Sequence, residues 1–150
     1  MFSEILLVLG LFSPSVDHAK NLTADVICGE VGSDRKASLY VAGVIANRVK
    51  AAKKGSLHER AVAVLTKPLQ FNGRCSKRGK KPLEHHIELA EKIVSGKPLG
   101  LPEWFTPKIQ FFTEAATAHK LVKRGLHLAH HYISDDQKTD IWFFVDPTTR

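Results

Sequence analysis

Apolar residues recur at helical spacing through the first two thirds of the chain, with turn residues between the repeats. Ser15 before the first repeat is a plausible helix start, and Gly32-Ser33-Asp34 interrupts the pattern after it. Ser56 and Glu59 have the spacing of a capping box. The pattern predicts four helices, over residues 16–30, 37–49, 60–65 and 82–96. In the last of these we expect the inward face to hold Ile87, Ala90, Ile93 and Val94.

The last third of the chain changes to short apolar runs separated by loops. Residues 67–81 form a turn-rich loop with Gln70-Phe71-Asn72 at its centre, and a second loop carries Trp104. The runs that follow predict short strands over 109–112 and 130–133 and a short helix over 115–122, and residues 141–145 form a last apolar run. Helices first and strands later indicate an α+β, mainly helical fold. At 150 residues the chain is expected to form a single domain.

Composition narrows the possible partners. The apolar fraction of 43% and charged fraction of 25% are typical of a globular protein. A formal net charge of +7 favours an anionic partner, which is nucleic acid, acidic lipid or an anionic cell-wall polymer. The basic residues concentrate at 74–81, where Phe71 is the nearby ring that could stack on a base. A nucleic-acid partner is therefore not expected. The basic loop is either a solvated surface loop or a contact for a glycan or polyanion.

The N-terminal segment, residues 1–15, contains an apolar run from Ile5 to Phe12. Eight residues are too few to span a bilayer, so stable membrane insertion is not expected. The run is either the apolar core of a secretory signal, although Glu4 stands where signals carry Lys or Arg, or an ordinary buried helix or strand.

The cysteines and histidines leave several alternatives open. Cys28 and Cys75 form one bridge if the protein is exported and stay as two free thiols otherwise. Cys28 is also conceivable as a nucleophile, against a simple role as a small buried residue. The pairs His85-His86 and His130-His131 point in different directions along an element, which is poor geometry for a metal. We expect neither a metal nor a cofactor.

Glu30 is the residue that most directly indicates a catalytic role. It lies at the end of the first predicted helix, behind the apolar residues Ile27 and Cys28 and before Val31. A carboxylate at the edge of a core loses part of its hydration, and partial burial of this kind favours the protonated form that a general acid needs. The alternative is a solvated glutamate at a helix end.

The order of these elements resembles the SleB-type cell wall hydrolase family, typified by the spore cortex-lytic enzyme. The residues that carry the resemblance are Cys28-Gly29-Glu30-Val31-Gly32-Ser33, Ala46-Asn47-Arg48-Val49, Gln70-Phe71-Asn72, the helix from Ile87 to Gly96, and the segment from Leu128 to Ile133 with His131. Phe111-Phe112 stands where the family has an aromatic segment with a histidine, which this chain lacks. The match covers roughly residues 16–134 and leaves 135–150 as a C-terminal extension. In place of the family's second glutamate this chain has Ser33 or Asp34.

The resemblance implies a lysozyme-like domain that cleaves the β-1,4 bond between N-acetylmuramic acid and N-acetylglucosamine in peptidoglycan. Glu30 would be the catalytic residue, and the substrate-binding residues would be Gln70, Phe71, Asn72, Asn47, Phe112 and His131. Exposed aromatics such as Trp104 would stack on sugar rings.

The number of carboxylates decides the expected reaction type. A hydrolase needs a second carboxylate near the acid, and Asp34 is the candidate close in sequence. A lytic transglycosylase needs one carboxylate, because the muramyl 6-hydroxyl attacks in place of water. We therefore expect a lytic transglycosylase that acts in the cell envelope, in the periplasm or outside the cell, or that is carried as a lysin in a phage particle with virion partners. The alternatives are a non-catalytic wall-binding or virion structural protein and a basic nucleic-acid-binding module.

Overall fold

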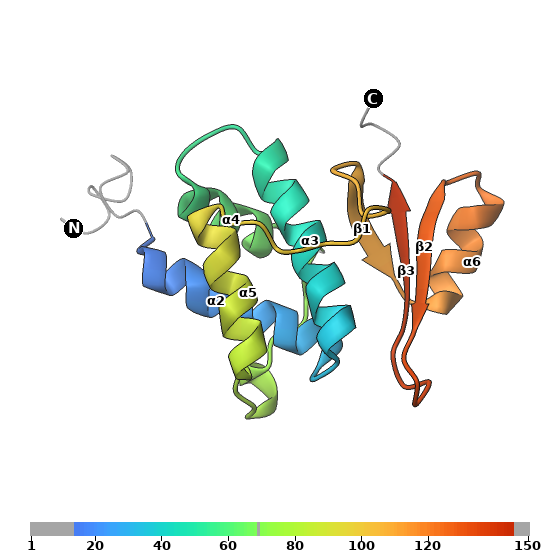
Figure 1. Cartoon of the computed structure of the whole chain (residues 1–150), viewed down its shortest axis with the longest axis horizontal. Coiled ribbons are helices and arrows are strands. Elements are labelled where there is room, and N and C mark those ends of the chain that lie inside the picture. The colour runs from blue at the N-terminus through green and yellow to red at the C-terminus, as the bar shows by residue number, and fades with distance from the viewer. Residues whose placement is uncertain (1–13, 69, 146–150) are drawn as a thin grey trace.

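The computed structural model describes residues 14–68 and 70–145. The apolar run over residues 5–12, with its two possible roles, lies outside the described residues. The elements are α2 (Val16–Val31), α3 (Arg35–Ala51), α4 (Leu57–Thr66), the short 3-10 helix η1 (Ser76–Arg78), α5 (Glu84–Ser95), β1 (Ile109–Thr113), α6 (Ala115–Lys123), β2 (Leu128–Ile133) and β3 (Asp140–Val145). This is the mainly helical α+β single domain that the sequence predicts (Figure 1).

Local capping interactions set where the first three helices begin. The Ser15 side chain accepts a hydrogen bond from the backbone N–H of His18, and the Asp34 carboxylate accepts one from that of Ala37. Ser56 and Glu59 form both halves of the predicted capping box at the start of α4. Each cap satisfies backbone donors that the first turn of a helix leaves without partners.

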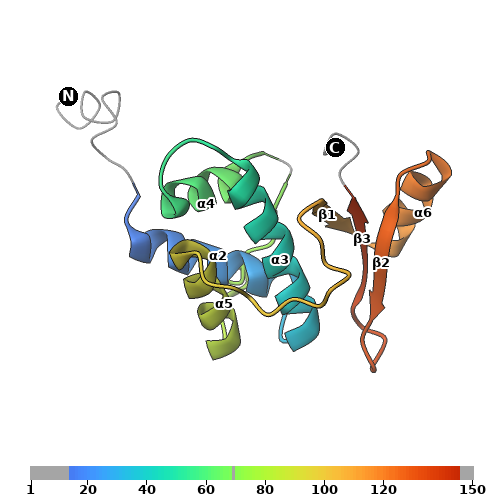
Figure 2. The ribbon, with the colours of Figure 1, turned by 45° about the horizontal axis from the view of Figure 1, so that its top comes forward.

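Helices α2, α3, α4 and α5 pack around one apolar core, with α2 in contact with the other three (Figure 2). One prediction for α5 is wrong: Ile87 is 41% exposed, and the fully buried residue of that turn is His86. The His86 ring accepts a hydrogen bond from the backbone N–H of Leu83, and its Nε2 lies 2.7 Å from the carbonyl oxygen of Gly32. Because both ring nitrogens have partners, this polar side chain can be buried.

The C-terminal part is a three-stranded antiparallel sheet in the order β1-β3-β2, with α6 packed against it. The central strand β3 consists of residues 140–145, which the sequence analysis assigned to a C-terminal extension. That boundary is wrong, because β3 pairs with both neighbouring strands and places Ile141, Phe143 and Phe144 in the interior.

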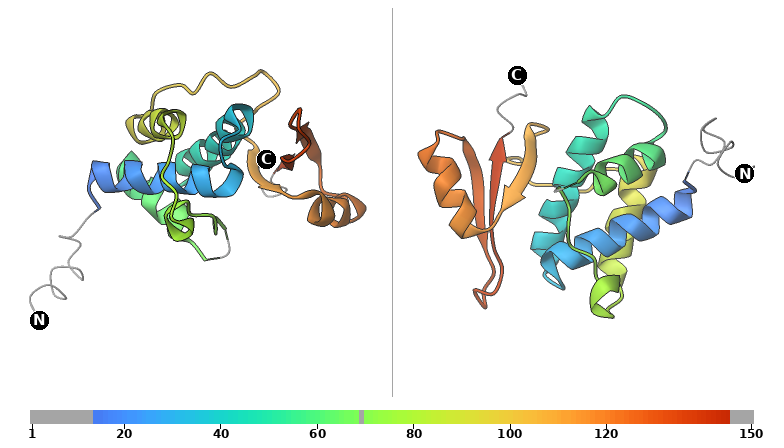
Figure 3. Two further views of the ribbon diagram at one scale, coloured as in Figure 1. Left: turned by 90° about the horizontal axis from the view of Figure 1, so that it is seen from below. Right: turned by 180° about the vertical axis from the view of Figure 1, so that it is seen from behind.

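Helix α3 joins the helical part to the sheet along its whole length (Figure 3). At its start, the hydroxyl of Tyr132 on β2 donates to both carboxylate oxygens of Asp34, at 2.9 and 2.8 Å. In its middle, the ring of Tyr40 packs against Phe143 of β3. Near its end, the Asn47 side chain donates to the carbonyl oxygens of Thr106 and Ile109.

In residues 14–68 and 70–145, no helix combines the length and the apolar character that a membrane crossing requires.

Candidate active site

Glu30 lies in the last turn of α2 and is half-buried. Its carboxylate oxygen Oε1 accepts a hydrogen bond of 3.0 Å from the backbone N–H of Gly73, in the loop that follows α4. This contact joins residues 43 positions apart and fixes the direction of the carboxylate. The Gly73 N–H is a donor that the sequence analysis did not single out.

Two glycines allow the loop to come this close to the helix. A Cβ on Gly29 would lie 2.2 Å from the backbone nitrogen of Arg74, and a Cβ on Gly73 would lie 2.5 Å from the carbonyl carbon of Gly29. Both distances are far below van der Waals contact, and the opposing atoms are backbone. Residues 29 and 73 therefore have no room for a side chain while the Gly73 N–H reaches Glu30.

A disulfide between Cys28 and Cys75 holds the same loop against α2, with Cα atoms 5.6 Å apart. This resolves the alternatives left open by the sequence in favour of the bridge, and Cys28 is not a free nucleophile. Asp25, one turn earlier, accepts hydrogen bonds from both the backbone N–H and the hydroxyl of Ser76. The end of α2 and residues 73–76 thus form one cross-linked unit.

A pocket of about 660 Å³ opens beside Glu30, between this unit and the ends of β1 and β3. Gln70, Asn72 and Phe112 line it together with Glu30, as the sequence analysis grouped them. Gln70 and Asn72 are exposed, and the Asn72 amide is available to a ligand, whereas the Gln70 amide oxygen already accepts a hydrogen bond from Arg48. Their role in substrate binding stays a prediction.

Three other proposed binding residues do not line this pocket. Phe71 is 4% exposed and packs beside Phe112 with ring centroids 6.1 Å apart, so it acts as a core anchor. Asn47 is 7% exposed, and its amide is occupied by the two carbonyl groups at the entry to β1. Trp104 stacks on the ring of His130 at 3.8 Å, which covers one face that a sugar would need. The alternation of polar and apolar residues could not show these contacts.

The expectation that Asp34 is the candidate second carboxylate is wrong. Asp34 caps α3 and accepts from Tyr132, and it does not line the pocket. Burial, together with the hydrogen bond to Asp34, raises the pKa of the Tyr132 hydroxyl, so this donor keeps its proton. The carboxylates that share the pocket with Glu30 are Glu114 and Asp140.

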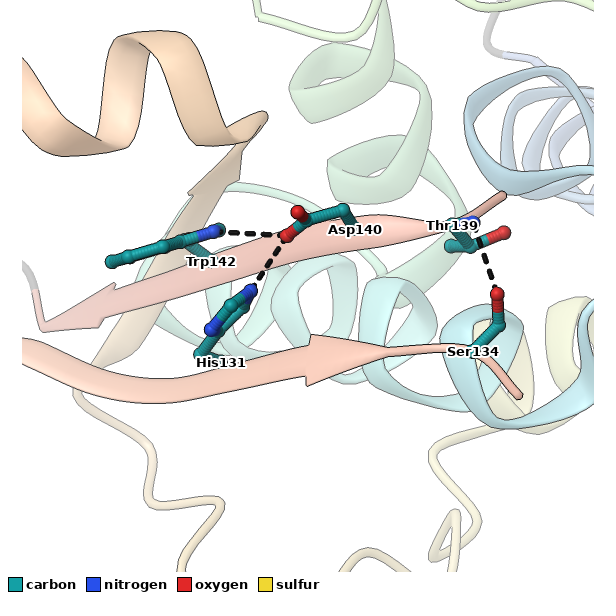
Figure 4. A network of polar contacts seen from close by, with 5 residues as sticks. All are labelled: His131, Ser134, Thr139, Asp140 and Trp142. Carbon is teal, nitrogen blue, oxygen red and sulfur yellow. Dashed lines mark hydrogen bonds and ion pairs between the residues drawn. The ribbon is translucent and has the colours of Figure 1, made fainter. Parts of the chain in front are cut away.

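Asp140 is held in place by two side chains of the sheet (Figure 4). Its Oδ1 lies 2.6 Å from His131 Nε2 and accepts from Trp142 Nε1 at 2.9 Å. At the base of the same hairpin, the backbone N–H of Thr139 donates to the hydroxyl of Ser134. His131, predicted to bind substrate, therefore lies behind the pocket wall and orients a carboxylate that does line it.

Asp140 could have been found by the argument that singled out Glu30. It begins the apolar run 141–145, so it is a lone carboxylate at the edge of a core. Glu114 carries no such signal, because it lies in the exposed link between β1 and α6.

Two motifs that are distant in the sequence meet at the side of the pocket. Arg48 donates hydrogen bonds to the Gln70 side chain and to the carbonyl oxygen of Gln110. Its guanidinium lies 5.1 Å from the centre of the Phe71 ring. Arg48 therefore supports Gln70 and Phe71, whereas Asn47 bonds to the carbonyl groups before and in β1.

The polar groups of the pocket suit a neutral, hydroxyl-rich ligand better than a metal. Beside the carboxylates it has two amides, the cations Arg78 and Lys138, and the hydroxyl side chains of Thr113 and Thr139. Within the described residues, no three His, Cys, Asp or Glu side chains are grouped so that they could hold a metal ion. Comparison of the chain with family models, with curated proteins and with solved structures finds no match.

Proposed function

We propose that the protein is a glycosidase that cleaves the β-1,4 bond between N-acetylmuramic acid and N-acetylglucosamine in peptidoglycan. The observation that carries this proposal is the position of Glu30, half-buried and aimed by the Gly73 N–H into a pocket with two exposed amides. Amide side chains can bond to the hydroxyl and acetamido groups of a glycan, and a fixed carboxyl can protonate the glycosidic oxygen.

Within this proposal the reaction that needs Glu30 alone is that of a lytic transglycosylase. Glu30 gives its proton to the oxygen of the leaving sugar as the bond to C1 breaks. It then takes the proton of the muramyl 6-hydroxyl, whose oxygen attacks C1 and closes a 1,6-anhydro ring. No water is consumed, and the carboxyl group returns to its protonated form.

Asp140 supports a second reaction type on the same substrate, a muramidase. It lines the same pocket as Glu30, and its orientation is set by His131 and Trp142. A second oriented carboxylate is what hydrolysis by water requires, as a base or as a nucleophile. Mass spectrometry of digested sacculi separates the two reactions, because an anhydro product is one water lighter than a reducing end. If reducing ends predominate, the transglycosylase is excluded.

Charge and covalent structure support the place of action that we propose. A net charge of +7 favours approach to an anionic wall, and disulfides persist in oxidising compartments. Both are compatible with action in the cell envelope or outside the cell, or with carriage in a phage particle.

The direct test is the loss of turbidity of purified peptidoglycan. Glu30→Gln keeps the hydrogen bond from Gly73 but has no proton to donate, so the rate should fall by roughly 10²–10⁴-fold at an unchanged melting temperature. Glu91→Gln, an exposed change on α5, is the matched control and should keep full activity. Substantial lysis by a folded Glu30→Gln protein would contradict the assignment. Wall binding without lysis by the unmodified protein would favour the non-catalytic alternative.

A further inference from the structure

A second pocket, of about 810 Å³, continues the groove away from Glu30. It shares Gln70, Phe112 and Thr113 with the Glu30 pocket, so the two pockets adjoin along β1. Its remaining walls come from the end of α3, from α4 and the turn after it, and from α6. A polymer that has a sugar at Glu30 would pass directly into this second pocket.

The charge of the groove changes sign between its two parts. The Glu30 pocket has three carboxylates and the two cations Arg78 and Lys138, whereas the side chains that line the second pocket include Arg48 and Lys67 and no carboxylate. Arg48 is a fixed charge, held by Gln70 and Gln110. Lys67 is exposed and, in the described part of the chain, forms no hydrogen bond or ion pair. Its ammonium group is therefore available to an anion.

The end of α3 does not cancel this positive charge. The last carbonyl groups of a helix carry partial negative charge. Here the guanidinium of Arg60 donates to the carbonyl oxygens of Val49 and Ala52 and so neutralises that end.

The rest of the second pocket is apolar on both sides. Ala63 and Val64 of α4 face one side, and Phe111 and Leu121 line the other. Thr113 and Thr117 add hydroxyl groups between them. A bare phosphate would use the cations and leave these apolar surfaces uncovered. A ligand with carboxylates and small methyl groups would use both.

We propose that the second pocket binds a short acidic peptide with small apolar side chains, namely the stem peptide that peptidoglycan carries on its muramic acid. This inference rests on the proposed function, because it places the muramic acid beside Glu30 and its peptide over Lys67. The groove would then select glycan strands that still carry their peptides.

The test uses nuclear magnetic resonance of ¹⁵N-labelled protein carrying Glu30→Gln, titrated with the free peptide L-Ala-γ-D-Glu-diaminopimelate. Backbone amide shifts should change at residues 63–67 and 111–121. Lys67→Ala should weaken binding about fivefold, because one charge-assisted contact is lost. Lys36→Ala, an exposed lysine at the start of α3 outside both pockets, should leave binding unchanged.

Two further ligands make the outcome decisive. The peptide with its carboxylates amidated should bind less tightly, and inorganic phosphate should not compete with the acidic peptide. Equal binding of the amidated peptide, shifts confined to the basic residues 77–81, or no response to Lys67→Ala would overturn the proposal. Because the free peptide has no glycosidic bond, this result is independent of whether the protein cleaves glycan.

Discussion

The two walls of the groove are built by different means. The wall that carries Glu30 is fixed by a covalent bridge, by the contact between Gly29 and Gly73, and by a backbone hydrogen bond to the carboxylate itself. The opposite wall, with Asp140, belongs to a small sheet that is joined to the helices through hydrogen bonds and ring contacts along α3. Asp140 is positioned by side chains of its own sheet and, within residues 14–68 and 70–145, makes no hydrogen bond to the helical part.

The difference between the two walls suits two different roles within one site. A general acid must keep its proton within reach of one oxygen atom, so a rigid support is of direct use to it. The facing wall must accept a polymer, and a wall held by non-covalent contacts can adjust its distance. We therefore expect substitutions in the Glu30 wall to lower both activity and stability. Substitutions at the contacts between α3 and the sheet should act mainly on the stability of the sheet.

Removing the disulfide bridge should have the largest effect on the stability of the protein. Cys28→Ala with Cys75→Ala opens a segment with a sequence separation of 47. The chain-entropy model predicts a loss of about 4 kcal/mol in the free energy of unfolding. Calorimetry should show a melting temperature lower by about 10 °C. Reduction of the native protein should reproduce the shift, and an unchanged melting temperature under complete reduction would rule out a stabilising role for the bridge.

The next effect should come from Gly29→Ala. Alanine favours a helix over glycine by about 1 kcal/mol. Overlap of its Cβ with the backbone of Arg74 should cost more, about 3 kcal/mol, because the bridge prevents the loop from moving away. We expect a net loss of about 2 kcal/mol in urea unfolding and a lower rate of peptidoglycan lysis. Lys36→Ala serves as the control for a surface helix position. A more stable Gly29→Ala protein would show that the loop can retreat.

A substitution at the contacts between α3 and the sheet should have a more local effect on stability. Asn47→Ala removes the donor of two hydrogen bonds and leaves the carbonyl groups of Thr106 and Ile109 with fewer partners. A loss of about 1–2 kcal/mol is expected. Hydrogen exchange should accelerate in β1 and much less in α2. Equal acceleration in both elements would contradict this difference, because it would show that the two walls unfold as one unit.

The smallest expected effect is a loss of stability at acid pH. Burial lowers the pKa of His86, and the hydrogen bond to Gly32 offsets this only in part. Above about pH 6.5 the ring is neutral in both the folded and the unfolded state, so its contribution to stability is complete. As the pH falls below 6.5, the unfolded chain binds the proton first and stability decreases down to the folded pKa.

Urea unfolding between pH 7.5 and 5 measures this dependence. His86→Gln keeps one donor and one acceptor but does not titrate, so its stability should vary less with pH than that of the native protein. A slope that is unchanged in His86→Gln would assign the acid sensitivity to another group.

The elements of this fold follow from local patterns, because caps and helical periodicity act within a few residues. Ser15, Ser56 and Glu59 begin helices where their spacing predicts, and the apolar runs after residue 108 form the three strands. Ile87 and His86 are the exception, since an apolar pattern cannot show that both nitrogens of a histidine will find partners.

By itself the sequence determined the helices, the strands and the candidate acid, because each depends on neighbours along the chain. Only the tertiary structure decided what surrounds Glu30. The contacts that build the site join Glu30 to Gly73, Arg48 to Gln70, and Cys28 to Cys75. Asp140 lines the same pocket and comes from a segment that the family resemblance does not cover. Such pairs carry no local signature, since their approach depends on how α2, α3 and the sheet pack and on two glycines that leave room for a backbone to pass.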